Sequence, residues 1–144
     1  MKLSLSMDHG ALALRAPILD ELAKMGHEVV DYGTKSSDSV DYPDFAERVC
    51  LDVQNGESDF GILCCTTAIG MSMAANKYKG IRAAVVHFED HAILTRQHNN
   101  ANILCLGAMH TSDYEARLFV RRFLETKFEG GRHERRICKF NDVE

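Results

Sequence analysis

The residue best suited to chemistry in this sequence is a cysteine that ends an apolar run and precedes a tight turn. Residues 59–84 read DFGILCCTTAIGMSMAANKYKGIRAA, which predicts a buried strand, an abrupt turn and a helix. Cys65 would end the strand, and Gly70 would lie at the start of the helix. The first amides of a helix lack internal partners, so they bind anions and lower the pKa of a nearby thiol. A thiolate there could remove a proton from carbon and stabilise the resulting enolate.

Cysteine is also a common core residue, so Cys65 could instead be an inert part of a buried strand. The chain has an odd number of cysteines and lacks a CxxC pair, which argues against a disulfide framework and a zinc site. This usage favours a reducing cytoplasm. Adjacent side chains of a strand point to opposite faces, so Cys64 would face away from Cys65. The five cysteines are Cys50, Cys64, Cys65, Cys105 and Cys138.

Composition predicts one globular domain. The 144 residues are 45% hydrophobic and 26% charged, which is sufficient for a core and atypical of disorder. The net charge of −4 gives no indication of nucleic-acid binding. Apolar runs stay well short of the roughly 20 residues that span a membrane. We therefore expect a cytoplasmic protein without a nucleic-acid or membrane partner.

Strand and helix patterns alternate along the whole chain. The later strands are continuously apolar, which is typical of parallel strands covered by helices on both faces. We therefore predict a single doubly wound, Rossmann-like α/β domain, whose five-stranded parallel sheet has the order 2-1-3-4-5 between helix layers. The expected strands are 2–7, 27–32, 60–65, 81–86 and 102–106, and the expected helices are 11–25, 43–54, 69–77, 90–98 and 112–128.

This strand order predicts where a site would lie. Strands one and three would be neighbours whose chains leave in opposite directions, which opens a crevice at their carboxyl ends. Asp8 and His9 follow the first strand and Cys65 ends the third, so all three would meet there. Taken singly, Asp8 could be a helix cap and His9 a surface imidazole.

Two further groups could do chemistry. His98 lies at the end of an expected helix, where it could interact with the helix dipole or transfer protons at neutral pH. Arg132 and Arg136 follow two glycines and could capture phosphate through paired hydrogen bonds. The residues alone favour the alternative, in which they belong to a solvated basic tail.

These groups, in this order, resemble the ribose-5-phosphate isomerase B family, which also includes the galactose-6-phosphate isomerase subunits. The resemblance extends over essentially the whole chain and rests on five ordered motifs. They are MDHGAL at 7–12, SVDYPDFA at 39–46, GILCCTTAIGMSMAANKYKGIRAA at 61–84, RQHNNANILCLGA at 96–108 and GGRHERR at 130–136.

The resemblance implies an aldose–ketose isomerase that acts on a phosphorylated sugar, with ribose 5-phosphate and ribulose 5-phosphate as the expected pair. Cys65 corresponds to the base that moves a proton between C1 and C2. His98 corresponds to the residue that assists ring opening, and Thr67 belongs to the turn that stabilises the enediolate. The implied substrate-binding residues are Asp8, His9, Tyr42, Thr66, Ala68, Ile69, Gly70, Asn99, Arg132 and Arg136.

The resemblance also implies the assembly. Family members share each active site between two subunits, as a homodimer or a dimer of dimers. His98, Asn99 and the two arginines would then serve the Cys65 of the neighbour, and a basic tail at about 129–144 would contact that neighbour. No metal and no organic cofactor is implied.

The sequence departs from the family at the turn and at one cation. The usual turn is CGTGIG, whereas this chain has Thr66 and Ala68 in place of two glycines. Met109 stands where an arginine usually helps to bind phosphate, and His110 could compensate. Two alternatives follow: an isomerase for a four- or six-carbon sugar phosphate, or a non-catalytic homologue that binds a sugar phosphate.

Overall fold

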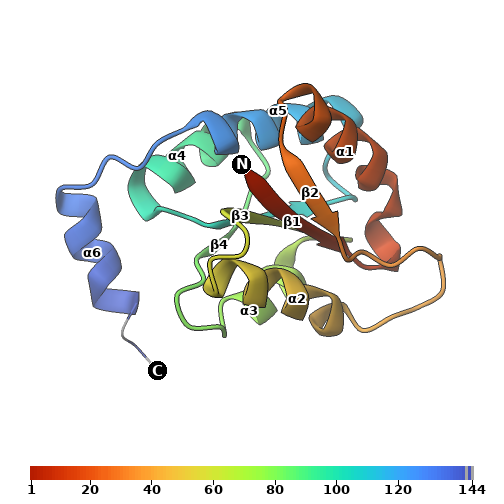
Figure 1. The fold of residues 1–144 in the computed structure, drawn as a ribbon, viewed down its shortest axis with the longest axis horizontal. Coiled ribbons are helices and arrows are strands. Elements are labelled where there is room, and N and C mark those ends of the chain that lie inside the picture. The colour runs from red at the N-terminus through yellow and green to blue at the C-terminus, as the bar shows by residue number, and fades with distance from the viewer. Residues whose placement is uncertain (142, 144) are drawn as a thin grey trace.

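A parallel five-stranded sheet lies between two layers of helices in the computed structural model, which describes residues 1–141 and 143 (Figure 1). The strands are β1 (Lys2–Met7), β2 (Glu28–Asp31), β3 (Phe60–Cys65), β4 (Ala83–Val85) and β5 (Ile103–Gly107). The helices are the 3₁₀-helix η1 (His9–Leu14), α1 (Arg15–Lys24), α2 (Tyr42–Gln54), α3 (Ile69–Ala75), α4 (Glu89–Asn99), α5 (Asp113–Glu125) and α6 (Arg132–Asn141). The predicted doubly wound α/β class is confirmed.

The predicted strand order is wrong at one edge. The sheet runs β2-β1-β3-β5-β4, so β5 rather than β4 lies beside β3. All five residues of β5 are buried, whereas β4 has only three residues, each of them partly exposed. An edge position leaves the backbone hydrogen-bonding groups on one side of a strand unpaired. The short, half-exposed β4 leaves fewer of these groups unpaired than β5 would. Since β1 still lies beside β3, the predicted crevice keeps its place.

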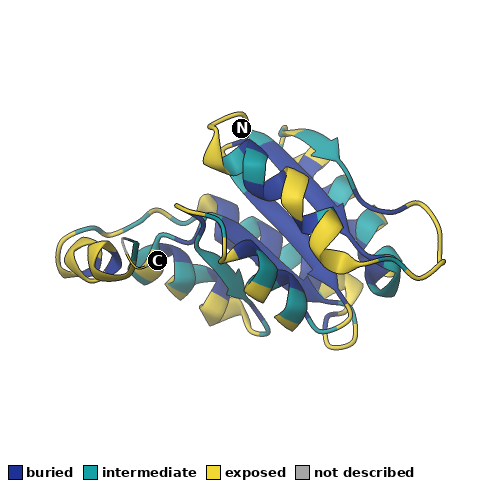
Figure 2. Ribbon diagram, turned by 90° about the horizontal axis from the view of Figure 1, so that it is seen from below, coloured by how far each residue is buried: buried dark blue, intermediate teal, exposed yellow. Residues whose placement is uncertain are grey.

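Two hydrophobic cores hold the helix layers on the sheet. One lies under α1, α4 and α5, where Phe119 and Phe123 are its largest buried side chains. The other lies under α2 and α3, around Val49 and Met71. Figure 2 shows the central strands β1, β3 and β5 as the most continuously buried part of the chain. Together the two cores fix the carboxyl ends of the central strands, on which the site depends.

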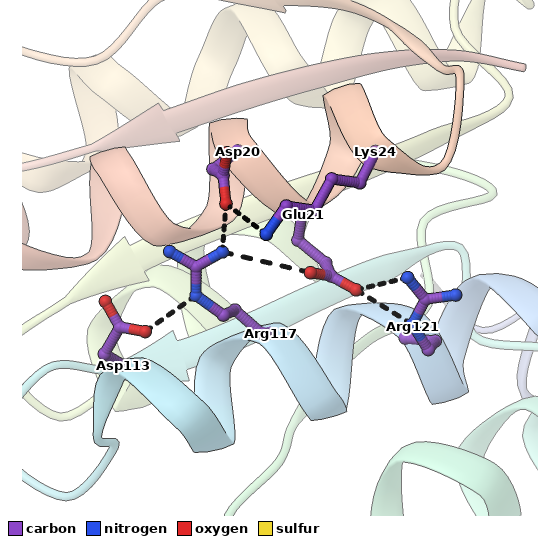
Figure 3. Close-up of polar contacts among 6 residues, drawn as sticks. All are labelled: Asp20, Glu21, Lys24, Asp113, Arg117 and Arg121. Carbon is purple, nitrogen blue, oxygen red and sulfur yellow. Dashed lines mark hydrogen bonds and ion pairs between the residues drawn. The ribbon is translucent and has the colours of Figure 1, made fainter.

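The outer faces of α1 and α5 are joined by a network of charged side chains (Figure 3). Arg121 donates from Nε to Oε1 of the nearly buried Glu21 over 2.8 Å. Arg117 donates to Asp113 over 2.7 Å and also to Asp20, which accepts from Lys24 over 3.0 Å. This network orients α1 against α5, on the side of the sheet away from α2 and α3.

Local sequence features account for where α1 and α5 begin. Pro17 lies in the first turn of α1, where a missing N–H costs nothing, and the preceding residues form η1 in place of the predicted longer helix. Ser112 caps α5: its Oγ accepts from the amide of Glu115 over 3.1 Å, and Glu115 accepts from the amide of Ser112. α5 ends at Glu125, earlier than predicted.

The residues expected to form a basic tail fold into a helix. α6 extends from the body of the molecule beside α4 (Figure 1). Its only buried residues are His133 and Ile137, so α6 covers little of this chain's own core. Within the part of the chain that the structure describes, none of the helices is both long enough and apolar enough to cross a membrane.

Candidate active site

The carboxyl ends of β1 and β3 lie side by side, and Asp8 directly follows β1. The amide of Asp8 donates to the carbonyl of Cys64 over 3.2 Å, which joins the two strand ends. Its carboxylate accepts from the amide of Gly10 over 2.9 Å and caps η1, so Asp8 does act as a helix cap. Asp8 is only 6% exposed. A buried carboxylate therefore lies beside the carboxyl end of β3.

A hydrogen bond to the ring of His9 determines which of its nitrogens carries the proton. The amide of Val40 donates to Nδ1 of His9 over 3.1 Å, so Nδ1 accepts and the neutral ring carries its proton on Nε2. Val40 belongs to the long loop between β2 and α2. The Nε2–H of the partly exposed His9 is therefore left to donate to a ligand such as phosphate.

Cys65 ends β3 with 5% of its surface exposed, and its backbone is fixed from β5. The carbonyl of Cys65 accepts from the amide of Ala108 over 3.0 Å, and the carbonyl of Thr66 accepts from Met109 over 2.9 Å. Burial raises the pKa of Cys50 to about 12 and also raises the pKa values of Cys64 and Cys105. Of the three cysteines in the sheet, Cys64 and Cys105 are fully buried and Cys65 alone keeps an exposed fraction.

The turn after Cys65 keeps a glycine-like backbone without the glycine. Ala68 has φ +70° and ψ −13°, a left-handed conformation that costs an alanine about 1–2 kcal/mol. The hydroxyl of Thr67 accepts from the amide of Ile69 over 3.3 Å and so shapes the entry to α3. The turn therefore retains the backbone path that the CGTGIG pattern implies, and the strain falls on Ala68.

Three close contacts between distant segments define the crevice, and the sequence did not predict them. The side chain of Thr66 lies against Gly10, where a methyl group would overlap its hydroxyl. Tyr42 lies over Gly70, so a methyl group there would come within 2.7 Å of the ring. A methyl group at Gly107 would come within 2.7 Å of the backbone of Thr67. These contacts thus fix the position of the turn that follows Cys65.

His98, Asn99 and the arginines lie elsewhere in the same chain. His98 and Asn99 form the last turn of α4, which leads to the amino end of β5, whereas Cys65 lies at the carboxyl end of β3. Arg132 and Arg136 belong to α6, beside α4. Because β3 and β5 are parallel neighbours, the amino end of β5 and the carboxyl end of β3 lie at opposite ends of the strands. One copy of the chain therefore does not bring the two predicted groups together.

His110 is engaged elsewhere. Its ring contacts the edge of His87 at a centroid distance of 5.8 Å, and Met109 is largely exposed.

Comparison with known proteins decides the family. The model of the Ribose/Galactose Isomerase family matches residues 3–140. The chain belongs to this family. Ribose-5-phosphate isomerase B of Escherichia coli (strain K12) is 41% identical over 143 residues, which cover 99% of this chain and 96% of that protein.

Solved structures support the same family. A ribose 5-phosphate isomerase of Thermotoga maritima is 49% identical with a TM-score of 0.95, covering 99% of this chain and 98% of its own. Ribose-5-phosphate isomerase B of Mycoplasma genitalium with bound ribulose-5-phosphate is 45% identical with a TM-score of 0.92, covering 97% and 93%. The predicted class, an aldose–ketose isomerase of sugar phosphates, is confirmed at the level of the family.

Proposed function

We propose that this chain interconverts ribose 5-phosphate and ribulose 5-phosphate, with Cys65 as the base. The observation that carries the proposal is Cys65 at the carboxyl end of β3, beside the Asp8 crevice and followed by a left-handed turn. The thiolate of Cys65 takes the proton from C2 of the open-chain aldose and returns it to C1. The electron pair of the broken C–H bond forms the C1–C2 double bond of the enediolate, and the proton of the O2 hydroxyl passes to O1 as the ketone forms.

The backbone of the turn stabilises that enediolate in this proposal. The hydroxyl of Thr67 and the amides of the turn, other than that of Ile69, which donates to Thr67, would donate to the charge that develops on O1 and O2. The left-handed Ala68 turns the chain so that α3 starts directly after Cys65. Asp8, from β1, holds a sugar hydroxyl at the crevice floor.

A second copy of the chain completes the site. His98 assists ring opening and Asn99 contacts the sugar, while Arg132 and Arg136 bind phosphate opposite Nε2 of His9. Two features support this assignment: α6 extends from the body (Figure 1), and the residues of α4 and α6 lie far along the sheet from their own Cys65. The assembly is a homodimer or a dimer of such dimers, in the cytoplasm.

The chain length of the sugar can be tested directly by nuclear magnetic resonance. The protein is mixed in D₂O with four-, five- and six-carbon aldose phosphates, and the appearance of each ketose and of deuterium at C1 or C2 is followed. We expect the fastest conversion for ribose 5-phosphate. Faster conversion of another sugar would contradict that substrate while leaving the isomerase class intact, and binding without exchange would contradict catalysis.

One contact favours a second candidate, an isomerase for a different sugar phosphate. The side chain of Thr66 fills space against Gly10 in the crevice, where the family pattern has glycine. In addition, Met109 supplies no charge for phosphate binding. If a four-carbon sugar phosphate is converted fastest, the reduced space at Thr66 accounts for it.

Sharing of the site predicts recovery of activity from two inactive variants. Cys65→Ala and the double variant Arg132→Ala/Arg136→Ala each leave every site incomplete in a homodimer. After unfolding and refolding together at equal amounts, half of the dimers combine both chains, and each such dimer has one intact site. We therefore expect about a quarter of wild-type activity. Activity no higher than that of the separate variants would indicate that each site is built from one chain.

A further inference from the structure

The rings of His98 and His133 stack on each other within one chain. Their centroids are 4.3 Å apart and their planes differ by 12°. His98 lies in the last turn of α4 and His133 in the first turn of α6. His133 is only 5% exposed, while His98 is partly exposed. A buried flat ring thus supports one face of a more accessible imidazole.

The backbone fixes this stack. The amide of Glu129 donates to the carbonyl of Gln97 over 3.1 Å, directly beside His98. Gly130 and Gly131 then adopt left-handed φ values of +70° and +57°, which turn the chain into α6. The amide of His133 donates to the carbonyl of Gly130 over 3.1 Å. The position of His133 is therefore set by the end of α4 itself.

The same residues form a group that could in principle hold a metal ion. One ligand atom each from His98, Glu129 and His133 lie within 4.8 Å of one another. However, the lone pairs of an imidazole lie in its ring plane, and two nearly parallel planes do not converge on one ion. The stack is therefore suited to supporting a ring rather than to binding a metal.

The surroundings of His133 keep it neutral near pH 7. Burial lowers the pKa of His133, and the cationic Arg132 and the neighbouring His98 lower it further; Arg136 acts in the same direction and Glu129 opposes them. Oε2 of Glu129 lies 3.4 Å from Nε2 of His133. A neutral ring lets His98 gain and lose a proton without a second positive charge against its face.

We propose that His133 is a positioning residue, whose stacked ring holds the imidazole of His98 in the orientation needed to open the sugar ring. This inference rests on the proposed function, in which His98 acts in the site of a second copy. His133 does not itself contact the sugar. It limits the rotation of His98 on the side away from the sugar.

The two directions of the reaction allow a sharp test. Ribose 5-phosphate is mostly a closed ring, whereas ribulose 5-phosphate stays open because the hydroxyl that would close its ring carries the phosphate. Turnover of ribose 5-phosphate therefore needs ring opening. Exchange of a C1 hydrogen of ribulose 5-phosphate with D₂O needs only the proton transfer at Cys65.

The experiment compares both rates in His133→Ala and His133→Phe. We expect His133→Ala to lower kcat for ribose 5-phosphate about tenfold or more and to change C1 exchange by less than about twofold. His133→Phe keeps a flat ring and is expected to stay within about threefold of the wild type in both rates. His133→Gln, which lacks the ring, replaces the alanine variant if the latter does not fold.

An equal loss of both rates in the ring-less variants would overturn the proposal, because the site as a whole would then be disturbed. Unchanged turnover in His133→Ala, or a His133→Phe variant as impaired as His133→Ala, would also overturn it. Wild-type protein without turnover or exchange would contradict the proposed function itself. The two failures are therefore distinguishable.

Discussion

Replacement of Cys65 with alanine is expected to lower kcat for sugar-phosphate isomerisation about 10²- to 10⁴-fold. The variant keeps the turn, the crevice and the phosphate-binding residues but removes the group that takes the proton, and general-base catalysis is worth that much. The Michaelis constant should change little, because the sugar and phosphate contacts remain. The measurement is steady-state kinetics with ribose 5-phosphate.

Cys64→Ala is the matched control for Cys65→Ala. Cys64 is the preceding residue of β3, is fully buried in the core under α1 and α5, and has a pKa raised by burial. Its loss should cost about 1 kcal/mol of stability and leave kcat within about threefold of the wild type. Full activity of Cys65→Ala, or a larger loss in Cys64→Ala, would remove Cys65 from the mechanism.

Gly107→Ala is expected to impair both stability and activity, although Gly107 bears no chemical group. An added methyl group would come within 2.7 Å of the carbonyl carbon of Thr67 and 2.8 Å of its oxygen. Because backbone cannot rotate away like a side chain, the turn must shift. We expect a loss of about 2–3 kcal/mol in the free energy of unfolding, measured with urea. We also expect kcat to fall about 100-fold, since a displacement near 1 Å can cost that much.

Gly56→Ala is the control that separates the effect of backbone strain from the effect of a displaced active-site turn. Gly56 has φ +75°, lies in the turn after α2, and has open space around its Cα. Its substitution should cost about 1 kcal/mol through the left-handed backbone and leave kcat unchanged. If Gly107→Ala kept wild-type kcat despite its lost stability, the position of Thr67 would not matter for catalysis.

The sequence allowed most of the fold to be predicted because the elements carry strong local signals. The range of β3 was predicted to the residue, and the expected helix at 112–128 begins within one residue of α5. The order of β4 and β5 was not predictable in the same way. Both read as apolar, and only the partial exposure and short length of β4 in the fold reveal an edge strand.

The site was predicted where it depends on topology and missed where it depends on packing. Asp8 and Cys65 were expected in one crevice because β1 and β3 are neighbours in either strand order. The contact of Tyr42 with Gly70 joins segments almost thirty residues apart, for which no local pattern gives a signal. The helical form of α6 was not predicted, because most of its residues are charged or polar and a basic tail was expected there.

A crystal structure of Cys65→Ala with ribulose 5-phosphate tests the central claim most directly. The account predicts that C1 and C2 of the sugar lie about 3–4 Å from the position of the missing sulfur. It also predicts phosphate between His9 of one copy and Arg132 and Arg136 of a second copy. A sugar bound with its carbonyl carbons away from residue 65, or a phosphate held without a second copy, would contradict it.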